Sequence, residues 1–194
     1  MFAAALTALL VADAAVATPA VPPAPPRMPD EMVIDLVTRG TVELECGKQP
    51  KALGMVVRGT SLVVAPPDYV RKNKCTLLQR SGEVAKVKRS FRRGNVDIFE
   101  LDGPAFAFGL PARDEPIAGV QLRAAGLSEG AVALGPIPLP AASEAVEMTV
   151  PSILLDSDAR VGGLAFGKQK LNVPEIRAAI MSPDPQKSEK LKGR

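Results

Sequence analysis

The middle of the chain consists of short segments rich in β-branched residues, and Gly or Pro interrupts them at short intervals. Segments of this kind between turn residues are typical of β-strands. Many such strands in succession indicate a sandwich or a barrel and argue against a parallel α/β sheet. We expect strands at residues 41–46, 53–57, 61–65, 75–79, 83–88, 96–101, 119–124, 131–134 and 145–150.

Helical periodicity is confined to two short segments. Residues 173–181 place Ile176 and Ile180 along one side, and Pro174 suits the first turn of a helix. Residues 30–38 fit either a first strand or a short helix. With 19 prolines and 16 glycines, the composition argues against a helical bundle. The sequence therefore predicts an all-β fold with a short C-terminal helix.

Both ends of the chain depart from the strand pattern. Residues 1–17 are apolar, short for a bilayer span, and end in an Ala-x-Ala cleavage pattern, so we interpret them as a signal peptide. An uncleaved anchor or a misassigned start codon is the alternative. Residues 18–31 form a Pro/Ala-rich linker, and residues 182–194 form a charged tail that we expect to be disordered. The remaining segment, 32–181, is the expected folded domain.

These assignments predict a bacterial protein of the periplasm or the extracellular space, with no integral membrane segment once the signal is cleaved. The two cysteines, Cys46 and Cys75, fit that location, because exported proteins pair their cysteines in disulfides. Two buried thiols in a reducing compartment are the alternative. A bridge would close a loop of about 30 residues and contribute roughly 3–4 kcal/mol in the chain-entropy model.

The chain contains no histidine. This excludes a Ser-His-Asp triad and histidine-ligated zinc, and two cysteines are too few for a four-cysteine zinc site or an iron–sulfur cluster within one chain. Asp156 and Asp158 could hold calcium from one strand face, but no third ligand is obvious, so a solvated turn is favoured. We therefore expect neither a metal nor a cofactor.

The most basic stretch lies in the middle of the chain. It alternates cations with other residues before a turn at Gly94 and Asn95, so a solvated strand face is the default interpretation. The alternative is a binding surface for an acidic protein, an anionic glycan or a lipid surface. Export and the lack of interleaved aromatic residues argue against nucleic acid. The candidate binding residues are Lys86, Lys88, Arg89, Arg92 and Arg93.

The order of several motifs resembles the trypsin-like (chymotrypsin-fold) serine proteases, in particular their bacterial periplasmic branch. Residues 53–64 are similar to the hairpin that precedes the catalytic histidine, and the segment APPDYV (65–70) falls where that histidine would lie. The segment NVDIFEL (95–101) falls at the aspartate strand, and DARVGGL (158–164) falls at the nucleophile loop. The resemblance covers 32–181 and implies a double β-barrel.

The departures from the family pattern concern its catalytic residues. Asp68, or its neighbour Tyr69, stands at the histidine position, Asp97 matches the aspartate, and Val161 stands at the nucleophile position. The resemblance then implies a pseudoprotease that is not an enzyme and that binds or scaffolds another protein. Two alternatives remain open: a hydrolase that uses carboxylates such as Asp68 and Asp97, with Asp102 nearby, and a β-sandwich that binds a small ligand or the envelope surface.

Overall fold

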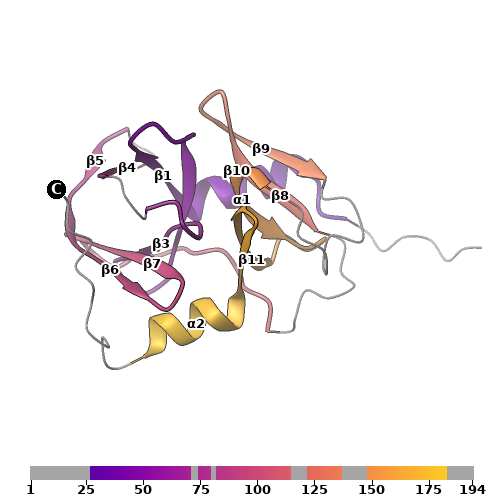
Figure 1. Ribbon diagram of the computed structural model, residues 1–194. Helices are drawn as coiled ribbons and strands as arrows, with labels where there is room; N and C mark the ends of the chain where they lie inside the picture. The colour runs from indigo at the N-terminus through magenta and orange to yellow at the C-terminus, as the bar shows by residue number, and fades with distance from the viewer. Residues whose placement is uncertain (1–26, 71–73, 80–81, 115–121, 137–147, 183–194) are drawn as a thin grey trace, which may run out of the picture.

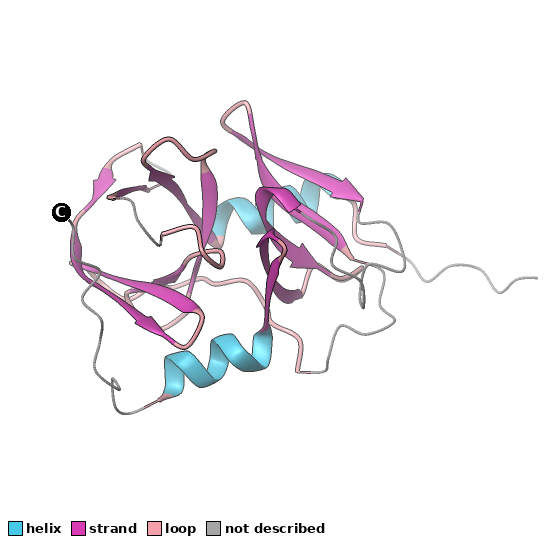
Figure 2. Ribbon diagram, in the orientation of Figure 1, coloured by secondary structure: helices cyan, strands magenta, loops and turns pink. Residues whose placement is uncertain are grey.

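The computed structural model describes residues 27–70, 74–79, 82–114, 122–136 and 148–182. The signal peptide 1–17, most of the linker and nearly all of the tail 182–194 lie outside these residues. Two antiparallel sheets and two short helices make up the described part (Figures 1 and 2). Neither helix has the length and apolar character needed to cross a membrane.

The first sheet has seven strands in the order β5-β4-β1-β2-β3-β7-β6. Because β5 and β6 follow each other in sequence but lie at opposite ends of this order, the sheet curls into a nearly closed barrel. The strands are β1 (Thr41–Cys46), β2 (Ala52–Val56), β3 (Leu62–Val64), β4 (Cys75–Leu78), β5 (Val84–Ala85), β6 (Val87–Arg93) and β7 (Val96–Leu101).

The second sheet has five strands in the order β12-β11-β10-β8-β9. Its centre is the long hairpin of β10 and β11. The strands are β8 (Arg123–Ser128), β9 (Ala131–Pro136), β10 (Met148–Leu155), β11 (Val161–Gly167) and β12 (Gln169–Asn172).

Helix α1 (Asp30–Arg39) begins the described fold and resolves the ambiguity in this segment. Its buried residues are Val33 and Val37, one helical turn apart, and Asp30 forms an ion pair with Arg123 of β8. The helix begins two residues before the expected domain start, inside the segment assigned to the linker. The boundary at Met32 is therefore too late.

Helix α2 (Val173–Met181) has the predicted bounds. The Asn172 side chain accepts a hydrogen bond from the Glu175 N–H at 3.0 Å, and the Glu175 carboxylate accepts one from the Asn172 N–H at 2.9 Å. Together these form a capping box, and Pro174 occupies the first turn. Ile176 and Ala179 are buried.

The apolar core has two main parts. One fills the first barrel with residues such as Leu44, Leu77 and Phe99. The other lies between the two sheets and both helices, and includes Ile98, Ile153 and other buried residues of β2, β7, β10, β11, α1 and α2. All five residues of β2 are buried because each of its faces contacts one of these clusters, which explains its lack of alternation.

The strand predictions hold for most of the first sheet, with one correction. Residues 83–88 form the short β5 and the beginning of β6, with an interruption at Lys86, so they are not one strand. In the second sheet, the predicted strands 119–124 and 145–150 fall partly outside the described residues. The apolar run from Ile153 and the stretch 161–167 form a hairpin, and β12 was not predicted.

Candidate functional site

Three charged side chains gather where the resemblance places the histidine and the aspartate. Arg92 on β6 donates from Nε and Nη2 to the two carboxylate oxygens of Asp97 on β7, at 2.8 and 2.9 Å. Its Nη2 also lies 3.5 Å from Oδ1 of Asp68. The Asp97 side chain is fully buried, whereas the Asp68 side chain is 26% exposed. The structure therefore brings Asp68 and Asp97 together through an arginine.

Sequence reasoning missed this role of Arg92 and treated it as a surface cation. The signal was present, because the turn at Gly94 and Asn95 pairs Arg93 with Val96 and thus Arg92 with Asp97. Asp97, with its hydrogen bonds to Arg92, raises the pKa of that guanidinium, which stays charged at any pH of interest. The buried carboxylate thus has a permanent counter-ion.

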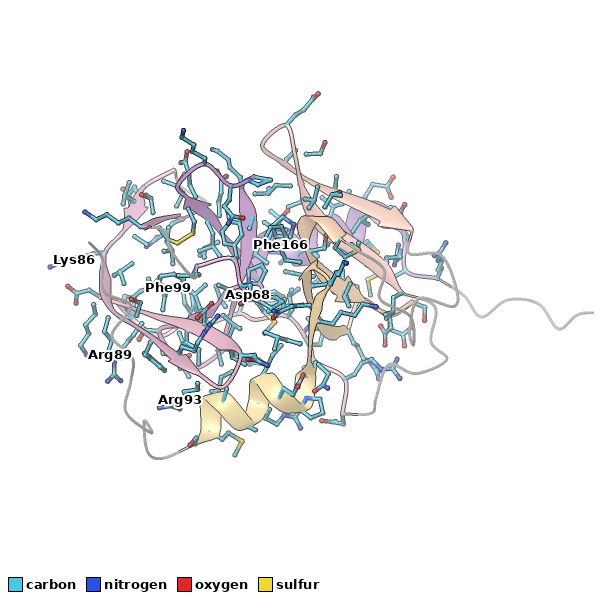
Figure 3. The ribbon with its side chains drawn as sticks, viewed as in Figure 1. Asp68, Lys86, Arg89, Arg93, Phe99 and Phe166 are labelled. Carbon is cyan, nitrogen blue, oxygen red and sulfur yellow. A yellow bond between two sulfur atoms is a disulfide. The ribbon has the colours of Figure 1, made fainter. Side chains whose placement is uncertain are left out.

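Asp68 has an unusual backbone conformation for a residue with a side chain. Its φ is 56°, in the left-handed region that favours glycine and that aspartate tolerates better than most residues. In Figure 3 Asp68 lies near the centre of the view, and its carboxylate contacts Arg92 of the first sheet. Asp68 is therefore the carboxylate of the pair that solvent or a ligand can reach.

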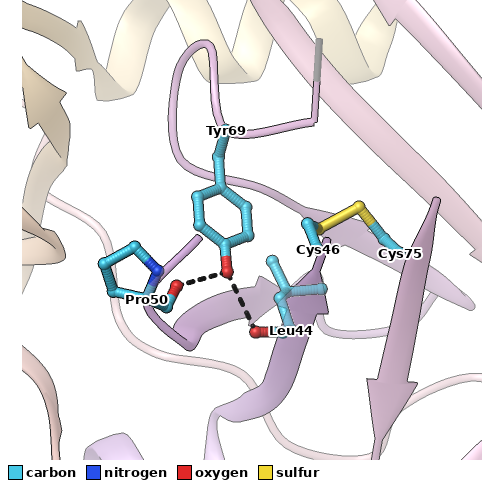
Figure 4. The surroundings of a disulfide bond; sticks show 5 residues. All are labelled: Leu44, Cys46, Pro50, Tyr69 and Cys75. Carbon is cyan, nitrogen blue, oxygen red and sulfur yellow. Dashed lines mark hydrogen bonds between the residues drawn. A yellow bond between two sulfur atoms is a disulfide. The ribbon is translucent and has the colours of Figure 1, made fainter. Parts of the chain in front are cut away.

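Tyr69 points away from this cluster and into the first barrel. Its hydroxyl donates to the carbonyl oxygens of Pro50 at 2.5 Å and Leu44 at 3.2 Å, next to the disulfide (Figure 4). Its ring makes an edge contact with Phe166 of β11, with centroids 5.8 Å apart. Tyr69 therefore joins the first barrel to the second sheet and is not available as an acid or base.

We expect Tyr69 to ionise only in strong alkali. Burial raises the pKa of its phenol from 10.0 to about 12. Because the folded pKa is above the unfolded one, the stabilisation is complete below pH 10 and is lost as the pH rises through about 12. Tyr69 is the only tyrosine and the chain has no tryptophan, so the phenolate absorbance reports this residue alone. A native titration near 10, equal to that in denaturant, would contradict the buried environment.

The predicted disulfide between Cys46 and Cys75 is confirmed. The two residues are direct cross-strand partners on β1 and β4. Cys46 is fully buried and contributes to the core of the first barrel. The bridge is compatible with an exported protein.

The turn between β10 and β11 corresponds to the nucleophile loop of the resemblance. The carboxylate of Asp156 accepts hydrogen bonds from the backbone N–H groups of Asp158 and Arg160, each at 2.9 Å. Its other oxygen accepts from Nη1 of Arg113 at 2.6 Å. These backbone donors therefore bind a side chain of the same turn. The same contacts make Asp156 unsuited to the calcium site considered from the sequence.

Val161 follows this turn as the first residue of β11. Its side chain is fully buried in the core between the sheets, and its backbone bonds to Pro111 and Arg113. The structure thus uses Val161 as a core residue.

Gly162 and Gly163 follow Val161 and lie within β11, whereas the turn residue with positive φ is Ala159, at 58°. Gly163 is required because a Cβ atom there would lie 2.3 Å from the carbonyl oxygen of Leu171 on β12. The glycine permits the close approach of these two strands.

The five candidate cations of the basic stretch do not form one surface. Arg92 pairs with Asp97, and Arg93 donates from Nη1 to the carbonyl oxygens of Ala179 and Ile180 at the end of α2, at 2.6 and 3.2 Å. Arg93 thus holds the helix to the β6–β7 hairpin and compensates the negative end of the helix dipole.

The other three cations, Lys86, Lys88 and Arg89, have exposed side chains and lie on β6 or directly before it. We call this set the basic edge, and Figure 3 shows Lys86 and Arg89 pointing outward from the molecule. Lys88 and Arg89 share Glu100, and their hydrogen bonds lower the pKa of that carboxyl, with Lys88 contributing most. Lys86 pairs with Asp102 at 3.0 Å, so Asp102 does not join Asp68 and Asp97.

No protein family model and no curated protein matches this sequence. Solved structures do match. One is Rv3671c from M. tuberculosis H37Rv, a serine-to-alanine mutant in an inactive form, with a TM-score of 0.54 and 14% identity over 84% of this chain and 99% of that chain. Another is the Rv3671c protease in an inactive form, with a TM-score of 0.50 and 15% identity over 77% of this chain and 91% of that chain.

These comparisons correct one prediction and confirm another. The inference that this chain is not an enzyme is contradicted, because the structures that it resembles are those of a protease. The missing histidine excludes one mechanism of hydrolysis and does not by itself exclude activity. The predicted architecture is confirmed by the two sheets, the C-terminal helix and the structural neighbours. The chain has the trypsin-like double β-barrel fold.

Proposed function

We propose that this chain is an exported trypsin-like domain that binds a segment of an acidic partner protein at the basic edge. The single observation that carries the proposal is the position of these cations. Strand β6 lies at the end of the seven-strand order, and the exposed Lys88 and Arg89 lie on it, with the exposed Lys86 directly before it. An edge strand can pair with an added strand, and cations beside it favour one with carboxylates.

Two further observations support polypeptide as the ligand. The structures that share this fold are of a protease, a class of protein that binds extended polypeptide. The basic edge has three cations against the two carboxylates of Glu100 and Asp102, so an incoming acidic segment meets a net positive charge. The side chains of the three cations are 62–81% exposed, so they can contact an incoming carboxylate as well as Glu100 and Asp102.

The test uses two fluorescent octapeptides that alternate Val with either Glu or Lys. We expect the full chain to bind the Glu peptide more tightly than the Lys peptide, with an affinity that falls as salt rises. The triple variant Lys86→Gln, Lys88→Gln, Arg89→Gln should weaken that binding about tenfold or more. Equal affinity for the two peptides would contradict the proposal.

The matched control removes three exposed lysines elsewhere, at Lys48, Lys74 and Lys168, by the same change to Gln. This variant has the same net charge as the first, so a purely long-range effect would weaken binding equally in both. A selective loss in the basic-edge variant supports a local site. An equal loss in both variants overturns it.

Hydrolysis of a bound polypeptide with Asp68 as the base is the second candidate function. The observation that favours it is the pairing of Asp68 and Asp97 through Arg92, at the position where the resemblance places the catalytic pair. Asp97 is buried and accepts two hydrogen bonds from Arg92. The partly exposed Asp68 is therefore the carboxylate that can contact water or substrate.

Incubation of the full chain with a peptide library, read by mass spectrometry, tests this activity. Cleavage that is lost in Asp68→Asn and retained in Asp102→Asn, with both variants folded, supports it. Cleavage that persists in Asp68→Asn, or labelling of a serine by a fluorophosphonate, would assign the chemistry to another residue. An intact library after incubation with the parent chain would refute the second candidate alone.

A further inference from the structure

An apolar cavity of about 200 Å³ lies where the first barrel, the second sheet and α2 meet. Its walls are formed by Met55, Leu110, Val161, Val173, Ile176 and Ile180. A dry apolar cavity of about 150 Å³ is large enough to bind benzene. This cavity therefore has the size for one aliphatic or aromatic side chain.

Two arginines stand at the same cavity. Arg177 donates from Nη2 to Asp114 at 2.8 Å and is half exposed. Arg58 is exposed, and within the described parts of the chain its guanidinium has no ion-pair partner. With one carboxylate and two guanidinium groups, the rim has a net positive charge. A ligand that combines an apolar side chain with an anionic group fits this arrangement.

The cavity also has a strip of backbone beside it. The Pro111 carbonyl accepts a hydrogen bond from the Val161 N–H at 2.7 Å, and the Arg113 N–H donates to the Val161 carbonyl at 2.9 Å. Successive residues of an extended segment direct their backbone groups to opposite sides, so the N–H and C=O of Ala112 point away from β11. Ala112 is exposed and lines the cavity, so these groups can pair with a peptide backbone.

We propose that this cavity binds the C-terminal residue of a polypeptide. The apolar side chain of that residue fills the cavity, its carboxylate pairs with Arg58, and the preceding backbone pairs with Ala112. The backbone groups favour a polypeptide over a free fatty or amino acid. Arg58, which has no ion-pair partner among the described residues, favours a chain end over an internal residue. The site lies apart from the basic edge and is independent of its proposed function.

The probe is a fluorescein-labelled hexapeptide that ends in Val-Leu with a free carboxylate, measured by fluorescence polarisation with the full chain. The same peptide as a C-terminal amide should bind about tenfold more weakly, the size expected for one lost charge-assisted hydrogen bond. Arg58→Gln should reduce the affinity for the free acid to that for the amide. N-acetyl-leucine, which lacks the peptide backbone, should compete poorly.

A second variant tests the cavity itself. Ala112→Leu places a larger side chain at the exposed mouth of the cavity and should weaken binding of the peptide about tenfold or more. Ala133→Leu makes the same change at an exposed position of β9 outside the cavity and should leave the affinity unchanged. Arg160→Gln, another exposed arginine that does not line the cavity, is the matched charge control.

Equal binding of acid and amide would overturn the proposal in favour of an internal residue. Competition by N-acetyl-leucine as strong as by the peptide would overturn it in favour of a small acid. An unchanged affinity in Arg58→Gln would overturn the role of the carboxylate. Loss of binding by the acidic octapeptides leaves these outcomes unaffected, because the two assays use different probes and variants.

Discussion

Replacing Arg92 by Met should lower the free energy of unfolding by about 3–5 kcal/mol, the usual cost of leaving a buried charge without its partner. Asp97 is fully buried, and both of its carboxylate oxygens accept hydrogen bonds from Arg92. Methionine keeps the length and the apolar part of the side chain, so the loss reports the ion pair more than the packing. At about 2–4 °C per kcal/mol for a chain of this size, the melting temperature should fall by roughly 10 °C or more.

The neighbouring Arg89 provides the matched control. It lies on the same strand, is 63% exposed and pairs with Glu100, so Arg89→Met should cost less than about 1 kcal/mol. Asp97→Asn removes the buried charge, so the double variant Arg92→Met, Asp97→Asn should recover more than half of the stability that Arg92→Met loses. Urea unfolding at neutral pH measures the free energy of unfolding of the parent and of each variant. Equal losses in Arg92→Met and Arg89→Met would refute the buried ion pair.

Loss of the disulfide should have an effect of similar size. The bridge joins residues 29 apart in the sequence, so Cys46→Ser and Cys75→Ser should each lower the free energy of unfolding by about 3–4 kcal/mol in the chain-entropy model. The buried Cys46 also packs in the core of the first barrel, and a serine there adds a desolvation cost. Calorimetry under non-reducing conditions should show the melting temperature falling by roughly 10 °C.

Reductant separates the bridge from the other effects of substitution. Dithiothreitol should destabilise the parent chain by most of the amount that each serine variant loses, and it should leave both variants unchanged. Thr76→Ser, next to Cys75 on an exposed position of β4, should be nearly neutral. A parent protein that melts at the same temperature with and without reductant would contradict a stabilising bridge.

Local patterns in the sequence were enough to predict much of this fold. Residues 173–181 contain their own start signal, because Asn172, Pro174 and Glu175 cap the helix without help from distant residues. The disulfide was predictable from the number of cysteines and the expected compartment. The segment that became α1 was ambiguous, because Val33 and Val37 suit a helical turn while their neighbours also suit a strand.

The arrangement of the candidate site depended on contacts that no local pattern contains. Arg113 and Asp156 are 43 residues apart, and nothing near either one indicates the other. The sequence motif placed Val161 at a nucleophile position, whereas the packing between the sheets makes it a core residue. The inference about activity failed for a different reason. The absence of histidine limits which mechanisms a protein can use, but it does not show that the protein has no activity. The observation that corrected the inference is the fold that this chain shares with a protease.

The contact of Arg93 with the last turn of α2 bears on how the chain acquires its structure. It links Arg93 to Ala179 and Ile180, which lie 86 and 87 residues further along the chain. Helix α2 also packs against β7. The first barrel is synthesised early, but the face of its β6–β7 hairpin remains uncovered until the final helix has left the ribosome. Contacts between distant segments form slowly, so this interval is when the unfinished chain is most open to proteolysis and aggregation. The C-terminal helix therefore completes the first barrel as well as the second.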